Sequence, residues 1–293
     1  MKGFESFHPA VLFLYYVLAV GISMVSRHPM VLAASVIGGF LLFGAMKGIR
    51  EVLKEIGFFF SLFLLMSLAN PLFVHKGEHI LFFMNDNPVT LEAMLYGMAS
   101  AVMIISVLLW CKCYSEILTT DKFLYLFGKL IPKLGLILSM AFRFIPLFKT
   151  QIKKINQSQK TMGLYASPGI PDKVGGGLRV FDCLLSWSME NSVETADAMK
   201  ARGYGLPGRT CFTPFQFRKR DGLLLGIVGV LTAGILISYA LGGYEFYYYP
   251  TVAKLSWNFK SVIGYLLLLG FMCIPGVIEL KEKMAWNYLK SKI

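Results

Sequence analysis

Six long apolar stretches constrain the fold of this chain more than any other feature of its sequence. Each is long enough to cross a bilayer as a helix, which takes roughly 17 to 25 residues. Of the 293 residues, 56% are hydrophobic and 16% are charged, whereas about a quarter are charged in soluble domains. The sequence therefore predicts an all-α fold, a polytopic membrane helix bundle of about six spans. The predicted spans are Pro9–Val25, Pro29–Met46, Ile56–Val74, Val89–Cys111, Gly222–Gly243 and Ser261–Leu280.

The placement of Lys and Arg predicts the orientation of this bundle. The N-terminus, residues 47–55, residues 112–220 and the C-terminal tail hold 25 of the 29 basic residues. Cytoplasmic connections are the ones enriched in Lys and Arg. We therefore expect a multi-pass protein of the cell membrane with both termini in the cytoplasm. The net charge of +12 reflects this topology, so we expect a lipid bilayer and no nucleic acid as its surroundings.

The segment from about Ser115 to Arg220 is too long for a connection and too apolar for a soluble linker. Its basic residues leave no uncharged run of 18 residues, yet apolar residues recur at helical spacing between Leu130 and Ile145. This pattern is typical of an amphipathic helix that lies on or against a membrane. Pro132 and Pro146 are expected to bend or end it. The interrupting basic residues are Lys122, Lys129, Lys133, Arg143 and Lys149.

A second amphipathic helix is expected from Leu178 to Arg202. Between the two helices, Ser167–Gly177 holds two prolines and four glycines, a composition that favours a loop or hinge. The sequence thus predicts two long amphipathic cytoplasmic helices joined by a flexible elbow. The predicted division of the chain is 1–112 for the N-terminal transmembrane helices, 113–220 for the cytoplasmic helices, and 221–293 for the C-terminal transmembrane helices and tail.

The end of the second amphipathic helix carries the tripeptide Ala201-Arg202-Gly203. Lys200 and Arg202 fall in the last turn, where the negative end of the helix dipole favours cations. Gly203 can adopt a positive φ and stop the helix, and Pro207 prevents an early restart. Such residues are also common at ordinary helix ends, so the tripeptide needs support from its surroundings.

Several kinds of chemistry have no counterpart in the sequence. There is no Gly-x-x-x-x-Gly-Lys-Ser/Thr phosphate loop, no His-Glu-x-x-His, no Gly-x-Ser-x-Gly and no paired carboxylates within a span. Glu92 and Glu279 lie near span ends. The pair His75 and His79 lacks an assured third ligand, and the five cysteines suit reduced thiols. We therefore expect no catalytic residue, metal or cofactor, and a part that transmits motion rather than an enzyme.

Three segments resemble the transmembrane T component of energy-coupling factor (ECF) transporters, the vitamin- and metal-importing branch of the ABC superfamily. They are Asn70–Gly77 with its Asn-Pro-Leu-Phe start, Phe142–Pro146 with Arg-Phe-Ile-Pro, and Ala198–Gly205 with Ala-Arg-Gly. The family's first Ala-Arg-Gly motif has Thr161-Met162-Gly163 as its counterpart, where only the glycine is kept. Lys160 stands next to it, although a lysine does not reproduce a planar guanidinium fork.

The resemblance implies that two cytosolic ABC-type ATPases cradle the two helix ends and bind the ATP, so this chain needs no cofactor. The implied contact residues are Ala201, Arg202, Gly203, Lys160, Thr161, Met162 and Gly163. A small substrate-binding membrane subunit, which would choose the vitamin or metal ion, is expected on the first amphipathic helix. The residues implied for it are Leu134, Ile137, Leu138, Ala141, Phe142 and Ile145; packing against the chain's own bundle is the alternative for each of them.

Two other classes of function compete with a coupling subunit. One is a stand-alone membrane carrier or membrane-embedded enzyme that uses the long cytoplasmic segment for regulation. It predicts transport or catalysis by the purified chain alone. The other is a structural membrane scaffold with no role in transport, and recruitment of ATP-binding subunits would separate it from a coupling subunit.

Overall fold

The computed structural model describes residues 3–74, 77–84, 87–163, 170–206, 215–253 and 258–291. The chain forms two compact units. Unit 1 comprises Met1–Phe123 and Phe215–Ile293, and unit 2 comprises Leu124–Pro214. The described residues are almost entirely helical, which confirms the predicted all-α class.

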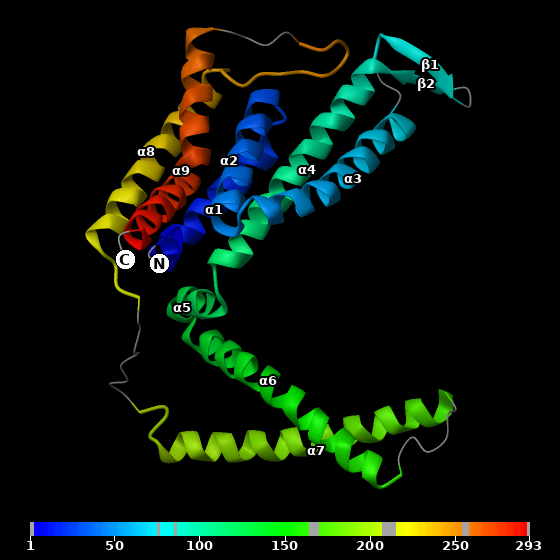
Figure 1. Ribbon diagram of the computed structural model, residues 1–293, viewed down its shortest axis with the longest axis vertical. Coiled ribbons are helices and arrows are strands. Elements are labelled where there is room, and N and C mark those ends of the chain that lie inside the picture. The colour runs from blue at the N-terminus through cyan, green and yellow to red at the C-terminus, as the bar shows by residue number, and fades with distance from the viewer. Residues whose placement is uncertain are drawn as a thin grey trace. The chain divides into compact units, whose positions relative to one another are not determined.

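Unit 1 is a bundle of six long helices that run alternately up and down (Figure 1). Their lengths follow from the apolar stretches, because a helix satisfies all of its backbone hydrogen bonds internally in lipid. A short 3-10 helix, η1, precedes them, and α5 starts in unit 1 after α4. The elements are η1 Phe4–Ser6, α1 Pro9–Val25, α2 Pro29–Lys47, α3 Ile49–Phe73, α4 Leu91–Ile117, α5 Thr120–Leu130, α8 Lys219–Ala240 and α9 Phe259–Lys290.

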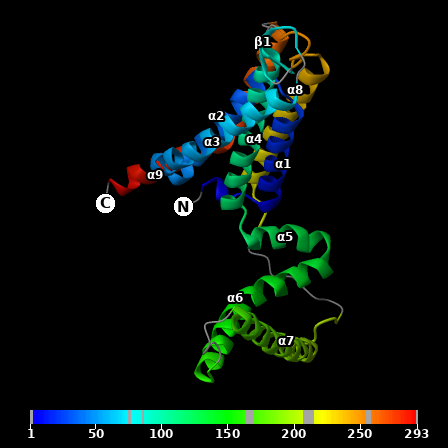
Figure 2. The ribbon, with the colours of Figure 1, turned by 90° about the vertical axis from the view of Figure 1, so that its right-hand side faces the viewer.

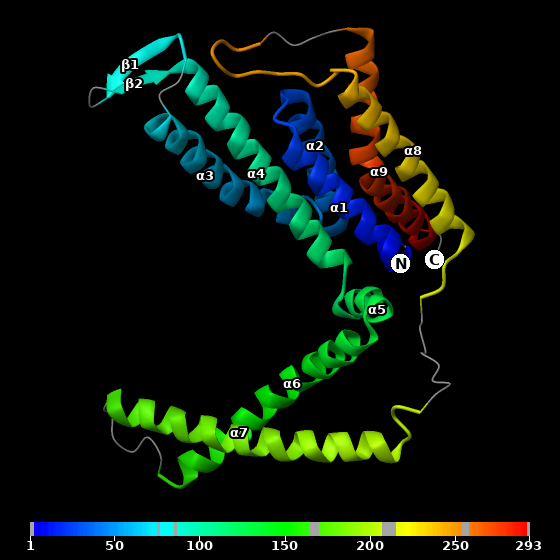
Figure 3. The same cartoon turned by 180° about the vertical axis from the view of Figure 1, so that it is seen from behind.

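The connections rich in Lys and Arg lie together at one end of unit 1, as the sequence predicts. Both termini, the α2–α3 link, the end of α4 and the start of α8 lie at one end of the bundle, as the views from the front and from behind agree (Figure 1, Figure 3). Ion pairs join neighbouring helices there, from Lys47 to Glu116 and from Lys112 to Glu55. The grouping fits six spans with both termini on one side; which side faces the cytoplasm stays a prediction.

The first two helices start in the same way. The Nδ1 atom of His8 accepts a hydrogen bond from the N–H of Ala10 (3.3 Å), and Nδ1 of His28 accepts one from the N–H of Met30 (3.2 Å). A proline follows each histidine, at the helix position where a missing N–H costs no hydrogen bond. The repeated His-Pro pair therefore fixes where α1 and α2 begin.

The core of unit 1 lies around α2, which packs against α4 and α9. The approach to α9 is close, since a Cβ atom at Gly38 would lie 2.5 Å from the carbonyl oxygen of Met272. On the α4 side, the hydroxyl of Ser35 bonds that of Ser106 and accepts from Nε1 of Trp110 (2.9 Å). Small residues and buried hydroxyl groups are common means of joining helices within membranes.

At the other end of unit 1, a two-stranded antiparallel hairpin joins α3 to α4. It consists of β1 (Ile80–Met84) and β2 (Asn87–Thr90). The buried carboxylate of Glu92 accepts from the N–H of His79 (3.3 Å), which ties the start of the hairpin to the first turn of α4. His75, which the sequence pairs with His79, lies outside the described residues.

Unit 2 contains the remainder of α5 and two long helices, α6 (Pro132–Thr161) and α7 (Ile170–Ala201). These helices pack against each other and cross (Figure 1, Figure 2). The ring of Phe148 on α6 meets the ring of Trp187 on α7 edge to face, with centroids 5.9 Å apart. The two predicted long helices are thus present, and they hold each other through aromatic side chains.

Several predicted boundaries were wrong. The elbow does not extend to Gly177, because α7 already begins at Ile170; Pro171 and Asp172 in its first turn both favour a helix start. The basic link at 47–55 is reduced to Gly48, whose φ of +87° allows α3 to begin at Ile49. Pro146 does not end α6, which continues through it.

The helices that could cross a membrane are not the same six that the sequence predicts. By length and composition, the described residues contain six candidates, which include residues 133–161 of α6. Pro9–Val25 is shorter and is grouped with the short apolar helices. A helix of 17 residues still spans about 26 Å at 1.5 Å per residue, close to the thickness of a bilayer core. The total of about six apolar helices is therefore confirmed.

Candidate functional site

The candidate site begins at the end of α7, where the backbone forms a Schellman motif. The N–H of Gly203 donates to the carbonyl oxygen of Lys200 (2.9 Å), and the N–H of Tyr204 donates to that of Met199 (3.0 Å). Gly203 has a φ of +79°, a conformation that side-chain-bearing residues rarely adopt. The predicted helix stop is confirmed, and Arg202 is the last residue before the turn.

The end of α6 has the same positive-φ glycine and the first of these two hydrogen bonds. The N–H of Gly163 donates to the carbonyl oxygen of Lys160 (3.1 Å), and Gly163 has a φ of +85°. Counted back from the two glycines, Met162 occupies the position of Arg202, and a lysine precedes each by two residues. We call residues 160–163 the first tip and residues 200–203 the second tip.

Both tips present their side chains to solvent. Lys160, Thr161, Met162, Ala201 and Arg202 are all exposed, and Met162 is 70% exposed. Within the described residues, Lys200 pairs with Asp197 at 3.7 Å, while no ion pair involves the Arg202 guanidinium. Within unit 2, the tips lie on opposite sides of the crossing between α6 and α7 (Figure 1). The two tips are therefore separate contact points. Each ends in a positive-φ glycine, but the first tip has one basic residue and the second has two.

The apolar face predicted on α6 is largely open. Ile137 is 59% exposed and Ile145 is 60% exposed, and Leu134, Ala141 and Phe142 are exposed as well. Leu138 is half-buried. Because these residues recur at intervals of three and four, they share one broad stripe of the helix. An exposed apolar stripe of this size is a surface for lipid or for another protein.

Sequence reasoning missed the contact that crosses the two helices. Phe148 stacks on Phe144 along α6 and meets Trp187 of α7. The signal in the sequence was the presence of aromatic residues on both helices, but nothing in the spacing shows which aromatic residues of two helices meet. It also missed Leu206, whose side chain folds back to within 3.1 Å of a Cβ placed on Gly203.

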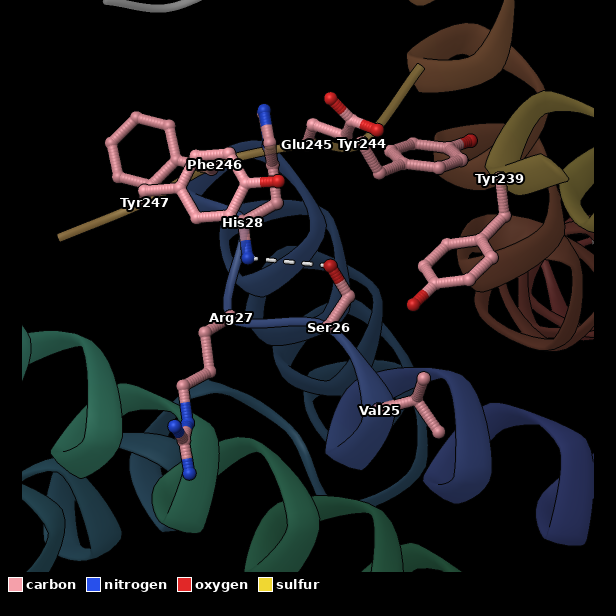
Figure 4. Close-up of a pocket in the computed structure, with 9 residues that line it drawn as sticks. All are labelled: Val25, Ser26, Arg27, His28, Tyr239, Tyr244, Glu245, Phe246 and Tyr247. Atoms are coloured by element: carbon pink, nitrogen blue, oxygen red, sulfur yellow. Dashed lines mark hydrogen bonds between the residues drawn. The ribbon is translucent and has the colours of Figure 1, made fainter. Parts of the chain in front are cut away.

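A pocket of about 330 Å³ lies in unit 1, between the α1–α2 link and the α8–α9 connection (Figure 4). Residues 25–28, Tyr239 of α8 and residues 244–247 of the α8–α9 connection line it, and none of the predicted site residues does. The Arg27 side chain points away from Tyr244 (Figure 4) and its guanidinium lies 4.9 Å from the centre of the Tyr96 ring. The Arg27 cation therefore links the α1–α2 connection to α4, which bears Tyr96.

The described residues contain no cluster of three or more His, Cys, Asp or Glu side chains that could hold a metal ion. Cys111, Cys113, Cys183 and Cys273 are free thiols.

The sequence is similar to one family of membrane transport proteins over most of its length. The model of the cobalt transport protein family (CbiQ) matches residues 6–211, more than half of the chain. The energy-coupling factor transporter transmembrane protein EcfT of Streptococcus thermophilus is 32% identical over 109 residues, which cover 36% of this chain and 40% of that protein. EcfT 1 of Listeria monocytogenes is 32% identical over 106 residues, again 36% and 40%.

A longer match, with EcfT of Staphylococcus aureus, is 27% identical over 178 residues and covers 57% of this chain and 66% of that protein. The chain thus spans about two fifths of the length of the first two relatives and about two thirds of the third. The resemblance to the transmembrane T component of ECF transporters is confirmed. The chain belongs to the cobalt transport protein family, and its relatives are transmembrane proteins of energy-coupling factor transporters.

Proposed function

We propose that this chain is the coupling subunit of an ECF-type importer. In this proposal, two cytosolic ABC-type ATPases bind the two tips, and a small substrate-binding membrane subunit binds the apolar stripe of α6. ATP-driven closure of the ATPases moves the tips, and α6 and α7 carry that motion to the substrate subunit. The imported solute is a vitamin or a metal ion, chosen by the substrate subunit, and ATP is bound by the ATPases alone.

The observation that carries the proposal is the pair of tips. Two helices of 30 and 32 residues each end at a glycine with a positive φ, whose N–H donates to the carbonyl oxygen three residues earlier, and their last side chains are exposed. A rigid helix transmits displacement along its length, and a glycine cap prevents the end from fraying. The two helices can transmit a displacement from outside the chain only if other molecules bind their exposed tips.

Arg202 is the residue proposed to hold the second tip. Its guanidinium has five N–H donors in a planar fork and stays charged at any physiological pH. Burial of such a group against carboxylate or carbonyl acceptors of a partner gives charge-assisted hydrogen bonds, and truncation of one partner then costs 2–5 kcal/mol or more in comparable interfaces. The small side chain of Ala201 lets the partner's surface approach the helix end closely.

Membrane placement follows from the basic residues. We propose that one end of unit 1 faces the cytoplasm, namely the end with both termini, the end of α4 and the start of α8. The Lys and Arg residues of the sequence are concentrated in these connections. Residues 113–220 form the cytoplasmic coupling region in this proposal. The same placement gives α6 and α7 access to cytosolic ATPases.

Co-purification tests the proposal. The chain is co-expressed with two ABC-type ATPase chains of the same genome, and capture of each ATPase is measured for wild type, Arg202→Glu and Arg179→Glu. Arg179 is an exposed residue in the middle of α7, so its variant matches the charge change away from the tip. We expect Arg202→Glu to lose at least one ATPase and Arg179→Glu to keep both; equal capture by all three chains would contradict the proposal.

A further inference from the structure

Residues Phe4–His8, which we call the N-terminal clasp, are bonded to three different helices of unit 1. The N–H of Phe4 donates to Oε2 of Glu279 on α9 (2.8 Å). The carbonyl oxygen of Glu5 accepts from Lys122 on α5, and that of Ser6 accepts from Arg220 on α8. The N–H of His8 donates to Asp221 on α8. Five consecutive residues thus tie together α5, α8 and α9.

The partners on α5 and α8 hold a particular place in the chain. Lys122 stands directly before the point where the chain leaves unit 1, after Phe123. Arg220 and Asp221, in the first turn of α8, follow the point where the chain returns at Phe215 by five and six residues. The clasp therefore connects the exit and the return of the segment that forms unit 2.

The exit is held by a buried cation. Lys122 is 6% exposed, and its Nζ lies 2.8 Å from the carbonyl oxygen of Glu5 and 2.8 Å from that of Ile117, the last residue of α4. The Glu5 carboxylate is more distant, at 3.6 Å. Desolvation lowers the pKa of Lys122, and Glu5 opposes that shift. A buried ammonium group that reaches two fixed carbonyl groups permits only a narrow range of positions for the helix that bears it.

The return is held by a buried carboxylate and a stacked guanidinium. Asp221 is 1% exposed; one of its oxygens accepts from His8 (3.1 Å) and the other from the N–H of Arg218 (2.8 Å), which starts α8. Arg220 donates from Nη2 to Ser6 (3.0 Å), and its guanidinium lies 5.3 Å from the centre of the Phe7 ring. The start of α8 therefore has a defined position relative to the clasp.

We propose that the N-terminal clasp is a positioning element for energy coupling. It holds the exit of the coupling segment at Lys122 and its return at Asp221 in fixed positions within unit 1. A displacement of α6 and α7 is then transmitted to the helix bundle and is not absorbed by local movement at these two connections. This inference rests on the proposed coupling function. It predicts that loss of the clasp lowers the amount of solute moved per ATP hydrolysed while the ATPases still bind, because both tips lie outside the clasp.

The test uses the full complex in proteoliposomes and measures three quantities for each variant: capture of the ATPases, ATP hydrolysis, and solute uptake. Lys122→Met removes the cation at the exit, and Asp221→Ala removes the acceptor at the return. Asp221→Asn keeps an oxygen acceptor for the N–H of His8 and serves as the conservative variant. Lys54→Met, which breaks the exposed pair between Lys54 and Glu51, is the matched control.

We expect Lys122→Met and Asp221→Ala to lower uptake per ATP by roughly five- to tenfold, a loss typical of coupling between sites. Asp221→Asn should recover much of that ratio, and Lys54→Met should leave it unchanged. Glu5→Gln should also have little effect, because the main contact of Lys122 is the Glu5 backbone carbonyl.

Each result separates the clasp from the coupling function itself. An unchanged uptake per ATP in Lys122→Met and Asp221→Ala, with the ATPases captured, would overturn the clasp and leave the coupling function standing. Failure of the wild-type chain and of Lys54→Met to capture ATPases would overturn the coupling function instead. If Lys122→Met does not reach the membrane, Arg220→Ala, which removes only the contacts to Ser6 and Phe7, decides by the same ratio.

Discussion

The backbone N–H of Tyr204 lies 3.0 Å from the carbonyl oxygen of Met199, and this hydrogen bond closes the last turn of α7. It forms only because Gly203, between them, has a positive φ. The bond fixes the direction in which the chain leaves the helix directly after Arg202. The orientation of the proposed ATPase contact therefore depends on the backbone conformation of Gly203.

Replacement of that glycine should loosen the second tip. Gly203→Ala places a side chain in the left-handed region, which costs about 1–2 kcal/mol, and sets its Cβ 3.1 Å from Leu206. Hydrogen exchange at the amide of Tyr204 should accelerate and ATPase capture should weaken. Gly175→Ala is the control, because this helical glycine has open space around it and alanine there should stabilise α7 by roughly 0.5–1 kcal/mol. Equal exchange rates in the two variants would contradict the role of Gly203.

The stability of unit 1 should depend on pH through His28. Its Nδ1 accepts from the N–H of Met30 (3.2 Å), so in the neutral ring Nε2 carries the proton toward the hydroxyl of Tyr265 (3.0 Å). Burial lowers the pKa of His28 in the folded state. The unfolded chain, with a pKa of about 6.5, then binds more protons, so stability should fall as pH decreases from that value toward the folded pKa and change no further below it.

Thermal unfolding in detergent between pH 8 and pH 5 measures this dependence. His28→Asn provides the comparison, because asparagine also caps a helix start but does not titrate. The variant should lose stability more gradually than the wild-type chain as pH decreases through the window below about 6.5. Parallel profiles for the two proteins would show that the helix cap at His28 does not titrate as the structure requires.

The buried hydroxyl cluster should make a large contribution to the stability of unit 1. Ser35 bonds Ser23 (2.6 Å) and Ser106 and accepts from the indole N–H of Trp110. Ser35→Ala leaves that indole N–H without its partner, which should cost about 1–3 kcal/mol and lower the unfolding temperature. Ser192→Ala removes only an exposed bond to the carbonyl of Ser188 and should have little effect; a comparable loss in both variants would argue against the cluster.

The apolar stripe of α6 should bind the substrate subunit. Ile137→Glu and Ile145→Glu place a charge on the open face, so capture of the substrate subunit should fall about tenfold or more, since burial of an unpaired carboxylate is costly. Capture of the ATPases should persist. Ile152→Glu, on the exposed polar part of α6 beyond the stripe, is the control. Wild-type capture by Ile137→Glu and Ile145→Glu would assign the stripe to lipid instead.

The sequence was sufficient to predict the features of the fold that arise from local chemistry. Apolar length gave six helices, the basic residues gave the sorting of connections between the two ends, and Gly203 predicted the stop of the second long helix. Helix starts were harder. Gly175–Gly177 indicate a loop on composition alone, but Pro171 and Asp172 favour a helix start, and α7 takes in the glycines as well.

Contacts between distant residues could not be predicted in this way. Nothing local indicates that Lys122 reaches Glu5 or that Asp221 reaches His8, since each pair is more than a hundred residues apart. The meeting of Phe148 and Trp187 is likewise a product of how two helices cross. These contacts determine which parts of the chain move together, and they emerged only from the three-dimensional arrangement.

Reconstitution in proteoliposomes tests the central claim most directly. Uptake of solute is measured for this chain alone, for the chain with the substrate subunit, and for the chain with that subunit and both ATPases. A coupling subunit requires all of its partners. Solute uptake should therefore occur only in the complete complex with ATP on the side of the membrane that the ATPases occupy. Arg202→Glu should abolish this uptake. Solute transport or ATP hydrolysis by the isolated chain would contradict the account.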